Sequence, residues 1–338
     1  MKIKLLVVLL FVANLCYGQV NVGSSKSPLN LYSKSLKAED FENLKKKSTC
    51  VILPEGIDQE RFKNNLKDVW DVNELKFVTG EEYKKNKERI LKESAVLKLV
   101  GDVYLIGKKN IATGKKRSTG ESITNFISLV IYDNVIMKKG KLKYDSKMLG
   151  EIVFSPNIKM RTNVVYSGGR KSFLAKASNK KALAANKEEP GFYTFNYGYI
   201  KNFTQILNDH LKRGVSISMR DGYVDSNTIK SLKNKTLYAP EWVLKRYAPV
   251  SSTLKEVSTP EEFFEDYDYD YKIVTDDDLN AKIEAGEDIY YFLHTQYNAE
   301  KVLAIIAAKT GKYVYLETGG SYNVKGSDFK ALNKAINK

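Results

Sequence analysis

The chain has 338 residues, 43% of them hydrophobic and 28% charged, with two cysteines and a formal charge of +15 at pH 7. A chain of this length can bury an ample core without covalent cross-links, so the small cysteine count excludes a disulfide-stapled extracellular module. Beyond the first residues, the longest apolar run is VLAIIAA at 302–308, which is far shorter than the roughly 20 residues that a membrane-spanning helix needs.

The first 18 residues, MKIKLLVVLLFVANLCYG, predict a secretory signal peptide, because two lysines precede a continuous apolar run that ends at a small residue. Cleavage after Gly18 is the preferred interpretation. Lipidation at Cys16 is the alternative, but Leu15 occupies the preceding position, where such sites favour a small side chain. We therefore expect export to the periplasm or outer-membrane periphery of a Gram-negative-type envelope, or secretion.

Export changes the partner that the positive charge predicts. Losing Lys2 and Lys4 with the signal lowers the formal charge from +15 to +13. In a cell interior this charge would favour nucleic acid, because bound phosphates release their counterions. In an envelope the available polyanions are lipid head groups, phosphorylated glycolipids and acidic polysaccharides, so no nucleic-acid partner is expected. A lysine-rich solvated surface without a dedicated anion site is the other explanation.

Residues 43–154 predict a first α/β unit, which follows a linker at 19–42. Thr79 begins a helix, because its hydroxyl and the carboxylate of Glu82 can each accept a hydrogen bond from a backbone N–H at the helix start. This helix should end near Glu93. The expected strands are TCVIL (49–53), LKFVT (75–79), AVLKLVGDVYLI (95–106) and ITNFISLVIYD (123–133), with a turn at KKGK before the next strand.

Residues 231–338 repeat these signals in the same order. SLKNKTLYAP at 231–240 is a loosened copy of NLKKKSTCVILP at 43–54, and each copy ends at a proline that is followed by glutamate. Thr275 begins a second capped helix. Because each signal rests on separate backbone physics, their agreement in order predicts a duplication. The other expected elements are the strands YKIVT (271–275), IYYFLH (289–294), KVLAIIAAK (301–309) and KYVYLE (312–317), and helices starting at TPEEFF (259–264) and DFKALNKAI (328–336).

Residues 155–230 form an insert that has no counterpart in the repeat. The part at 161–190 is basic and rich in Ser, Ala, Asn and Gly, which predicts a mobile, exposed segment. The part at 199–214 predicts a helix with an apolar stripe and a glycine stop. The fold class is therefore α/β or α+β, with two pseudo-repeated mixed-sheet domains, flanking helices, and a helical and basic insert between them.

No catalytic or metal-binding residue is predicted. The motifs SxxK at 178–181 and KTG at 309–311 occur in penicillin-binding proteins and β-lactamases, but the second falls at a hairpin turn that needs its glycine, and no SxN or YxN lies between them. Cys50 lies in the middle of an apolar strand, where a thiol is inert packing. His210 and His294 also have structural explanations, and so few ligands do not predict a zinc site.

Candidate ligand-binding residues come from a basic loop in the first unit, from the basic insert and from one aromatic side chain. Glycines at 107, 114 and 120 do not spell a phosphate-binding loop, so no nucleotide or other cofactor is expected. Trp242 follows Pro240 with little apolar company, which favours an exposed aromatic. The candidates are Lys108, Lys109, Lys115, Lys116, Arg117, Arg161, Arg170, Lys171, Lys176 and Trp242.

These observations favour a non-catalytic module that binds, or serves as a scaffold for, an envelope partner. That partner would be an envelope protein or an anionic glycan or lipid surface, contacted through the basic loop and the insert. A hydrolase acting on an envelope polymer is the alternative, although no residues of this chain support it.

Overall fold

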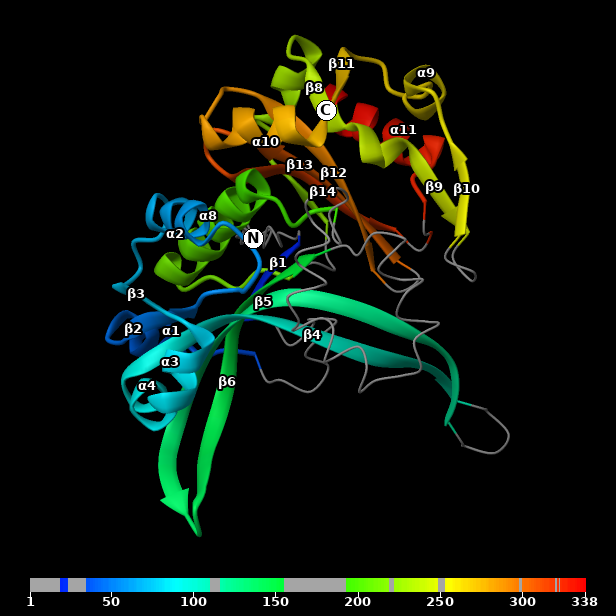
Figure 1. Cartoon of the computed structure of the whole chain (residues 1–338). Helices are drawn as coiled ribbons and strands as arrows, with labels where there is room; N and C mark the ends of the chain where they lie inside the picture. Colours follow the sequence, from blue (N-terminus) through cyan, green and yellow to red (C-terminus); the bar gives the residue numbers. More distant parts are fainter. Residues whose placement is uncertain are drawn as a thin grey trace, which may run out of the picture.

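The structure, a computed structural model, describes residues 19–23, 35–109, 116–154, 193–218, 222–248, 253–297, 300–319, 321 and 323–338. These residues form two six-stranded mixed sheets with helices packed on them, one sheet in each half of the chain (Figure 1). The predicted α/β organisation in two repeated mixed-sheet units is therefore confirmed. No helix in the described ranges is both long and apolar enough to cross a membrane.

The first sheet has the strand order β1-β6-β5-β4-β2-β3. Strand β2 is parallel to both of its neighbours, and the other pairs are antiparallel. The expected single helix after Thr79 is divided in two at Asn86, although Thr79 and Glu82 form the predicted capping box. The elements of this half are β1 (Val20–Val22), α1 (Ala38–Lys45), β2 (Ser48–Ile52), α2 (Gln59–Lys67), β3 (Leu75–Val78), α3 (Gly80–Lys85), α4 (Lys87–Glu93), β4 (Ser94–Lys109), β5 (Lys116–Lys138), β6 (Lys141–Phe154) and α8 (Tyr197–Arg213).

The second sheet has the order β11-β8-β12-β13-β14-β7, and a separate two-stranded ribbon joins β9 to β10. Thr275 caps α10 by accepting a hydrogen bond from the backbone N–H of Asp278, as predicted. The elements are β7 (Tyr223–Val224), η2 (Ile229–Lys233), β8 (Leu237–Pro240), η3 (Glu241–Leu244), β9 (Lys245–Ala248), β10 (Thr253–Val257), α9 (Pro260–Phe263), β11 (Tyr271–Val274), α10 (Asp276–Glu284), β12 (Tyr290–Tyr297), β13 (Glu300–Ala307), β14 (Lys312–Gly319) and α11 (Gly326–Asn337).

The two sheets have the same topology. When the second sheet is followed from β7 to β11, its order β7-β14-β13-β12-β8-β11 corresponds strand by strand to β1-β6-β5-β4-β2-β3. The pattern of parallel and antiparallel pairs is also the same. Even the irregularity is shared, because the ladder slips by one residue between Leu129 and Val130 and again between Ile305 and Ile306. A β-bulge is a specific device that bends a strand, so its recurrence at one position supports a duplication.

Strand pairing corrects one detail of the repeat. Thr49 pairs with the first residue of β3, and Leu237 pairs with the first residue of β11. Pro240 is therefore equivalent to Ile52 and not to Pro54. The two Pro-Glu dipeptides therefore look alike in the sequence but do not occupy equivalent positions in the two sheets. Equivalent positions are defined by the hydrogen-bond register and not by residue identity.

Helix α8 is the helix that the sequence predicted within the insert. The insert was expected to have no counterpart in the second unit, but α8 has a counterpart there, which is α11. Helix α8 follows β6 as α11 follows β14. Leu207 of α8 lies directly over Gly150 of β6, because a Cβ added to Gly150 would be 2.5 Å from the Cδ1 atom of Leu207. Phe329 of α11 packs on Phe292, with ring centroids 5.8 Å apart. Since Gly150 and Phe292 lie on equivalent faces of their sheets, α8 and α11 cover the same face of each unit.

Helix α8 also packs against the second unit, on the opposite face of that sheet. The hydroxyl of Tyr291 donates to Asn202 Oδ1 at 2.9 Å, and the rings of Tyr199 and Tyr291 lie 5.9 Å apart. The helix is thus buried between two sheets, as Figure 1 shows. Helix α11, by contrast, presents exposed Lys330 and Lys334 on its outer side.

Candidate functional site

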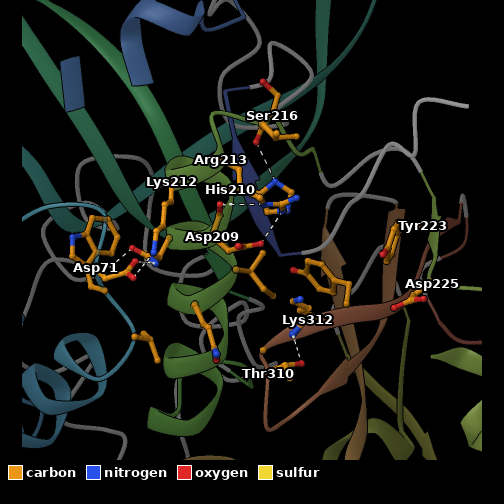
Figure 2. A pocket seen from close by; sticks show the side chains of 18 of the residues that line it. Asp71, Asp209, His210, Lys212, Arg213, Ser216, Tyr223, Asp225, Thr310 and Lys312 are labelled. Carbon is orange, nitrogen blue, oxygen red and sulfur yellow. Dashed lines mark hydrogen bonds and ion pairs between the residues drawn. The ribbon is translucent and has the colours of Figure 1, made fainter. Parts of the chain in front are cut away.

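A cleft with a volume of about 970 Å³ lies between the two units. Its walls come from four segments that are distant in sequence: the turn at 67–71 after α2, the last turns of α8, the residues at 223–227 and the turn at 310–313 (Figure 2). Clefts where two folded units meet are common locations for ligand sites. We therefore take this cleft as the candidate functional site.

The C-terminal end of α8 supplies most of the charged side chains. The helix stops at Gly214, whose φ of +66° is a left-handed conformation that favours glycine. Lys212 and Arg213 occupy the last turn, where positive charge complements the helix dipole. Figure 2 shows these side chains directed into the cleft, with Asp71 facing Lys212 from the first unit.

Opposite charges in this part of the cleft are paired with one another. Lys212 Nζ lies 2.6 Å from Asp71 Oδ2, and Arg213 Nη2 lies 2.8 Å from Asp209 Oδ2. Hydrogen bonds from Asn208 and Lys212 hold the pKa of Asp71 below its usual value. Asn208 Oδ1 also accepts from the backbone N–H groups of Asp71 and Val72, each at 3.0 Å, and so ties the turn to the helix.

His210 is held neutral beside these pairs. Its Nδ1 lies 3.1 Å from the carbonyl oxygen of Val215, which requires Nδ1 to carry the proton. Its Nε2 is then an acceptor, and Arg213 Nη2 lies 3.4 Å from it. Burial lowers the pKa of the ring, and the hydrogen bond to Val215 opposes this shift only partly.

The second unit contributes a polar and partly apolar wall. Burial alone would raise the pKa of Asp225, but its bonds from the Thr228 hydroxyl at 2.6 Å and from the backbone of Asn227 and Thr228 lower it overall. Lys312 and half-buried Tyr223 line the same wall. Val215 and Val224 add exposed apolar surface, with 44% and 37% of each residue accessible.

The described residues of the cleft offer many hydrogen-bond donors and acceptors, and no acid–base pair is recognisable among them. The carboxyls of Asp71 and Asp225 have lowered pKa values, whereas a general acid requires a raised one. Cys50 is buried outside the cleft, and burial raises the pKa of its thiol to about 11, which agrees with inert packing. Within the described part of the chain, no three His, Cys, Asp or Glu residues are grouped to hold a metal ion.

None of the basic candidates from the sequence is among the described residues that line this cleft. Lys108, Lys109, Lys116 and Arg117, which were expected in a loop, belong to the ends of β4 and β5, where Lys108 pairs with Arg117 and Lys109 with Lys116. The ladder therefore continues further than the apolar pattern indicated. Five candidates lie outside the described residues: Lys115, Arg161, Arg170, Lys171 and Lys176. The predicted mobile segment at 161–190 also lies outside them.

The expectation of an exposed Trp242 is wrong. Only 7% of this residue is accessible, because η3 turns it inward directly after β8. Its Nε1 donates to Asp276 Oδ1 at 3.0 Å, and its ring stacks on Tyr193 with centroids 4.9 Å apart. Tyr199 donates to the same carboxyl at 2.7 Å, so Trp242 belongs to a buried network that joins α8 to α10.

A row of polar side chains crosses the sheet of the first unit on the face opposite α8. It consists of Lys98, Ser128, Glu151 and Asn21, which are cross-strand neighbours. Ser128 and Glu151 are almost wholly buried, and Asn21 Nδ2 donates to Glu151 Oε1 at 3.0 Å. Burial raises the pKa of Glu151 to about 8, although the bond from Asn21 opposes this. The second unit has apolar or aromatic residues instead, because α8 covers that face there. The equivalent positions are Lys98 and Leu293, Ser128 and Ala304, Glu151 and Leu316, and Asn21 and Tyr223.

The residues of the cleft carried no motif in the sequence. They become neighbours only because the two units stack through α8, and periodicity does not encode that contact. The nearest signal was the KTG turn at 309–311, whose last two residues line the cleft. Comparison of the chain with protein-family models, with curated proteins and with solved structures found no match.

Proposed function

We propose that this chain is an exported, non-catalytic binding protein of a bacterial envelope, and that the cleft between its units takes a hydroxyl-rich glycan segment. The signal-like start of the sequence supports export. The choice of ligand rests on the pairing of Lys212 with Asp71 and of Arg213 with Asp209, which neutralises much of the positive charge at the end of α8. A polyanion would require unpaired cations, and an apolar ligand would require apolar walls.

Paired carboxylates, ammonium groups and amides supply both donors and acceptors, which suits hydroxyl groups that act as both. Tyr223, Val215 and Val224 provide an apolar surface for the carbon face of a sugar ring, and a tyrosine adds a polar tip. The lowered pKa values of Asp71 and Asp225 favour binding over the alternative of polymer hydrolysis.

Titration of the full chain with neutral soluble chito- and cello-oligosaccharides, followed by calorimetry, tests this proposal. Lys312→Ala is expected to weaken binding roughly tenfold, which corresponds to one lost charged hydrogen bond. Lys309→Ala is the matched control, because it removes the same charge from the same turn but lies outside the cleft.

Binding to the glycan should persist as salt is raised, because the ligand carries no charge. Equal loss in both variants, or retention only on anionic polymers at low salt, would replace the glycan site with a general polyanion surface. Release of shortened oligosaccharides during the titration would instead support the hydrolase.

A further inference from the structure

The hairpin between β5 and β6 is much longer than its equivalent in the second unit. Val130 and Ile306 are equivalent, as are Met148 and Tyr313, so residues 132–146 stand where the second unit has only 308–311. Figure 1 shows this hairpin projecting away from the rest of the chain at the bottom of the view. The repeated fold does not need the projection, because the second unit closes the same turn without it.

The base of the hairpin is anchored to the body. Tyr132 and Tyr144 meet edge to face at 5.1 Å, and Lys87 of α4 lies 5.7 Å from the ring of Tyr144. The ladder slips between Asp133 and Ile136, where Asn134 adopts a φ of +52° and donates to Asp145 Oδ2 at 2.7 Å. This bulge fixes the direction in which the rest of the hairpin leaves the sheet.

The tip, residues 134–143 (NVIMKKGKLK), combines exposed apolar side chains with positive charge. Ile136 and Met137 are 53% and 55% accessible, which makes them two of the three most exposed large hydrophobic residues in the described ranges. Four lysines and no acidic residue belong to the tip. No ion pair within the described part of the chain involves these lysines, whereas Lys147 at the base lies 2.6 Å from Asp40. The four lysines are Lys138, Lys139, Lys141 and Lys143.

We propose that this tip is a docking surface for anionic phospholipid bilayers. Lysines near a membrane surface are attracted to anionic head groups, and adjacent apolar side chains enter the boundary between head groups and acyl chains. A soluble polyanion would use the charges but not Ile136 and Met137. The surface is separate from the cleft, so the chain can hold a ligand while docked on a membrane.

Sedimentation of the full chain with lipid vesicles tests this inference. The wild type should bind vesicles of phosphatidylcholine mixed with phosphatidylglycerol and not vesicles of phosphatidylcholine alone. Changing the four tip lysines to glutamine should weaken binding on the order of 1,000-fold, since each lysine near an anionic surface contributes about 1 kcal/mol and every 1.4 kcal/mol is a factor of ten. The matched control changes four exposed lysines of the second unit to glutamine and should bind as the wild type does: Lys230, Lys233, Lys272 and Lys334.

A second variant separates a bilayer from a soluble polyanion. Ile136→Ser with Met137→Ser keeps every charge, so weaker vesicle binding in this variant would support insertion of the apolar tip. Unchanged vesicle binding, together with equal competition by soluble dextran sulfate, would overturn the bilayer assignment. Equal losses in the tip and control lysine variants would overturn it as well, because binding would then follow overall charge. A urea midpoint equal to that of the wild type checks that each variant is folded.

Discussion

Glu151→Gln is expected to remove a dependence of stability on pH that amounts to several kcal/mol. Burial raises the pKa of Glu151 from 4.5 to about 8, so the folded chain favours the protonated carboxyl. The contribution of this group is therefore most favourable below pH 4.5 and is lost as the pH rises from 4.5 to about 8. At roughly 1.4 kcal/mol for each unit of pKa, the loss is on the order of 5 kcal/mol.

Urea unfolding of the wild type and of Glu151→Gln across this pH range measures the effect. The difference between their free energies of unfolding should change across the range and become constant above pH 8. Glu151→Leu, which introduces the residue found at the equivalent position of the second unit, should show the same loss of pH dependence. Glu241→Gln, at an exposed position, is the control and should follow the wild type. A constant difference between wild type and Glu151→Gln would contradict the raised pKa.

Gly198→Ala is expected to destabilise the chain by about 1–3 kcal/mol, the usual cost of forcing an extra methyl group into a packed interface. In an exposed helix the same change stabilises by about 1 kcal/mol, so the expected sign is reversed. A Cβ on Gly198 would lie 2.8 Å from the backbone oxygen of Asn280 and 3.1 Å from its Cα. Helices α8 and α10 would have to separate to admit it.

The matched control is Gly80→Ala at the start of α3, where an added Cβ has no atom within 4 Å. This variant should be as stable as the wild type or slightly more stable. Urea unfolding of both variants at one pH gives the comparison. If Gly198→Ala were stabilised as much as Gly80→Ala, the two helices would not approach as closely as described.

Local signals were predictable because the backbone alone determines them. The caps at Thr79, Thr259 and Thr275 satisfy N–H groups that any helix start leaves free, and all three form. Glycines at 140 and 311 close the two equivalent hairpins with φ values of +68° and +64°. The order of such signals was enough to predict the repeat and the mixed sheets.

Features that depend on distant neighbours were not predictable in this way. Trp242 is buried because Asp276 and Tyr193 meet it from other elements, although its sequence neighbours suggested exposure. The strands around Lys108 and Lys116 continue because a partner strand satisfies their backbone groups, and apolar periodicity does not register such pairing. The cleft is a further case, since all four of its segments converge only after the units have stacked.

Because α8 is buried against both sheets, we do not expect either half of the chain to fold independently of the other. A chain cut after Ser218 would leave Tyr199 and Asn202 without their partner Tyr291, and the C-terminal fragment would bare the sheet face that carries Leu293, Ala304 and Leu316. Newly bared apolar faces of this kind promote aggregation. We therefore expect the two copies to behave as halves of one cooperative body that unfolds in a single transition, and we expect neither half to fold stably by itself.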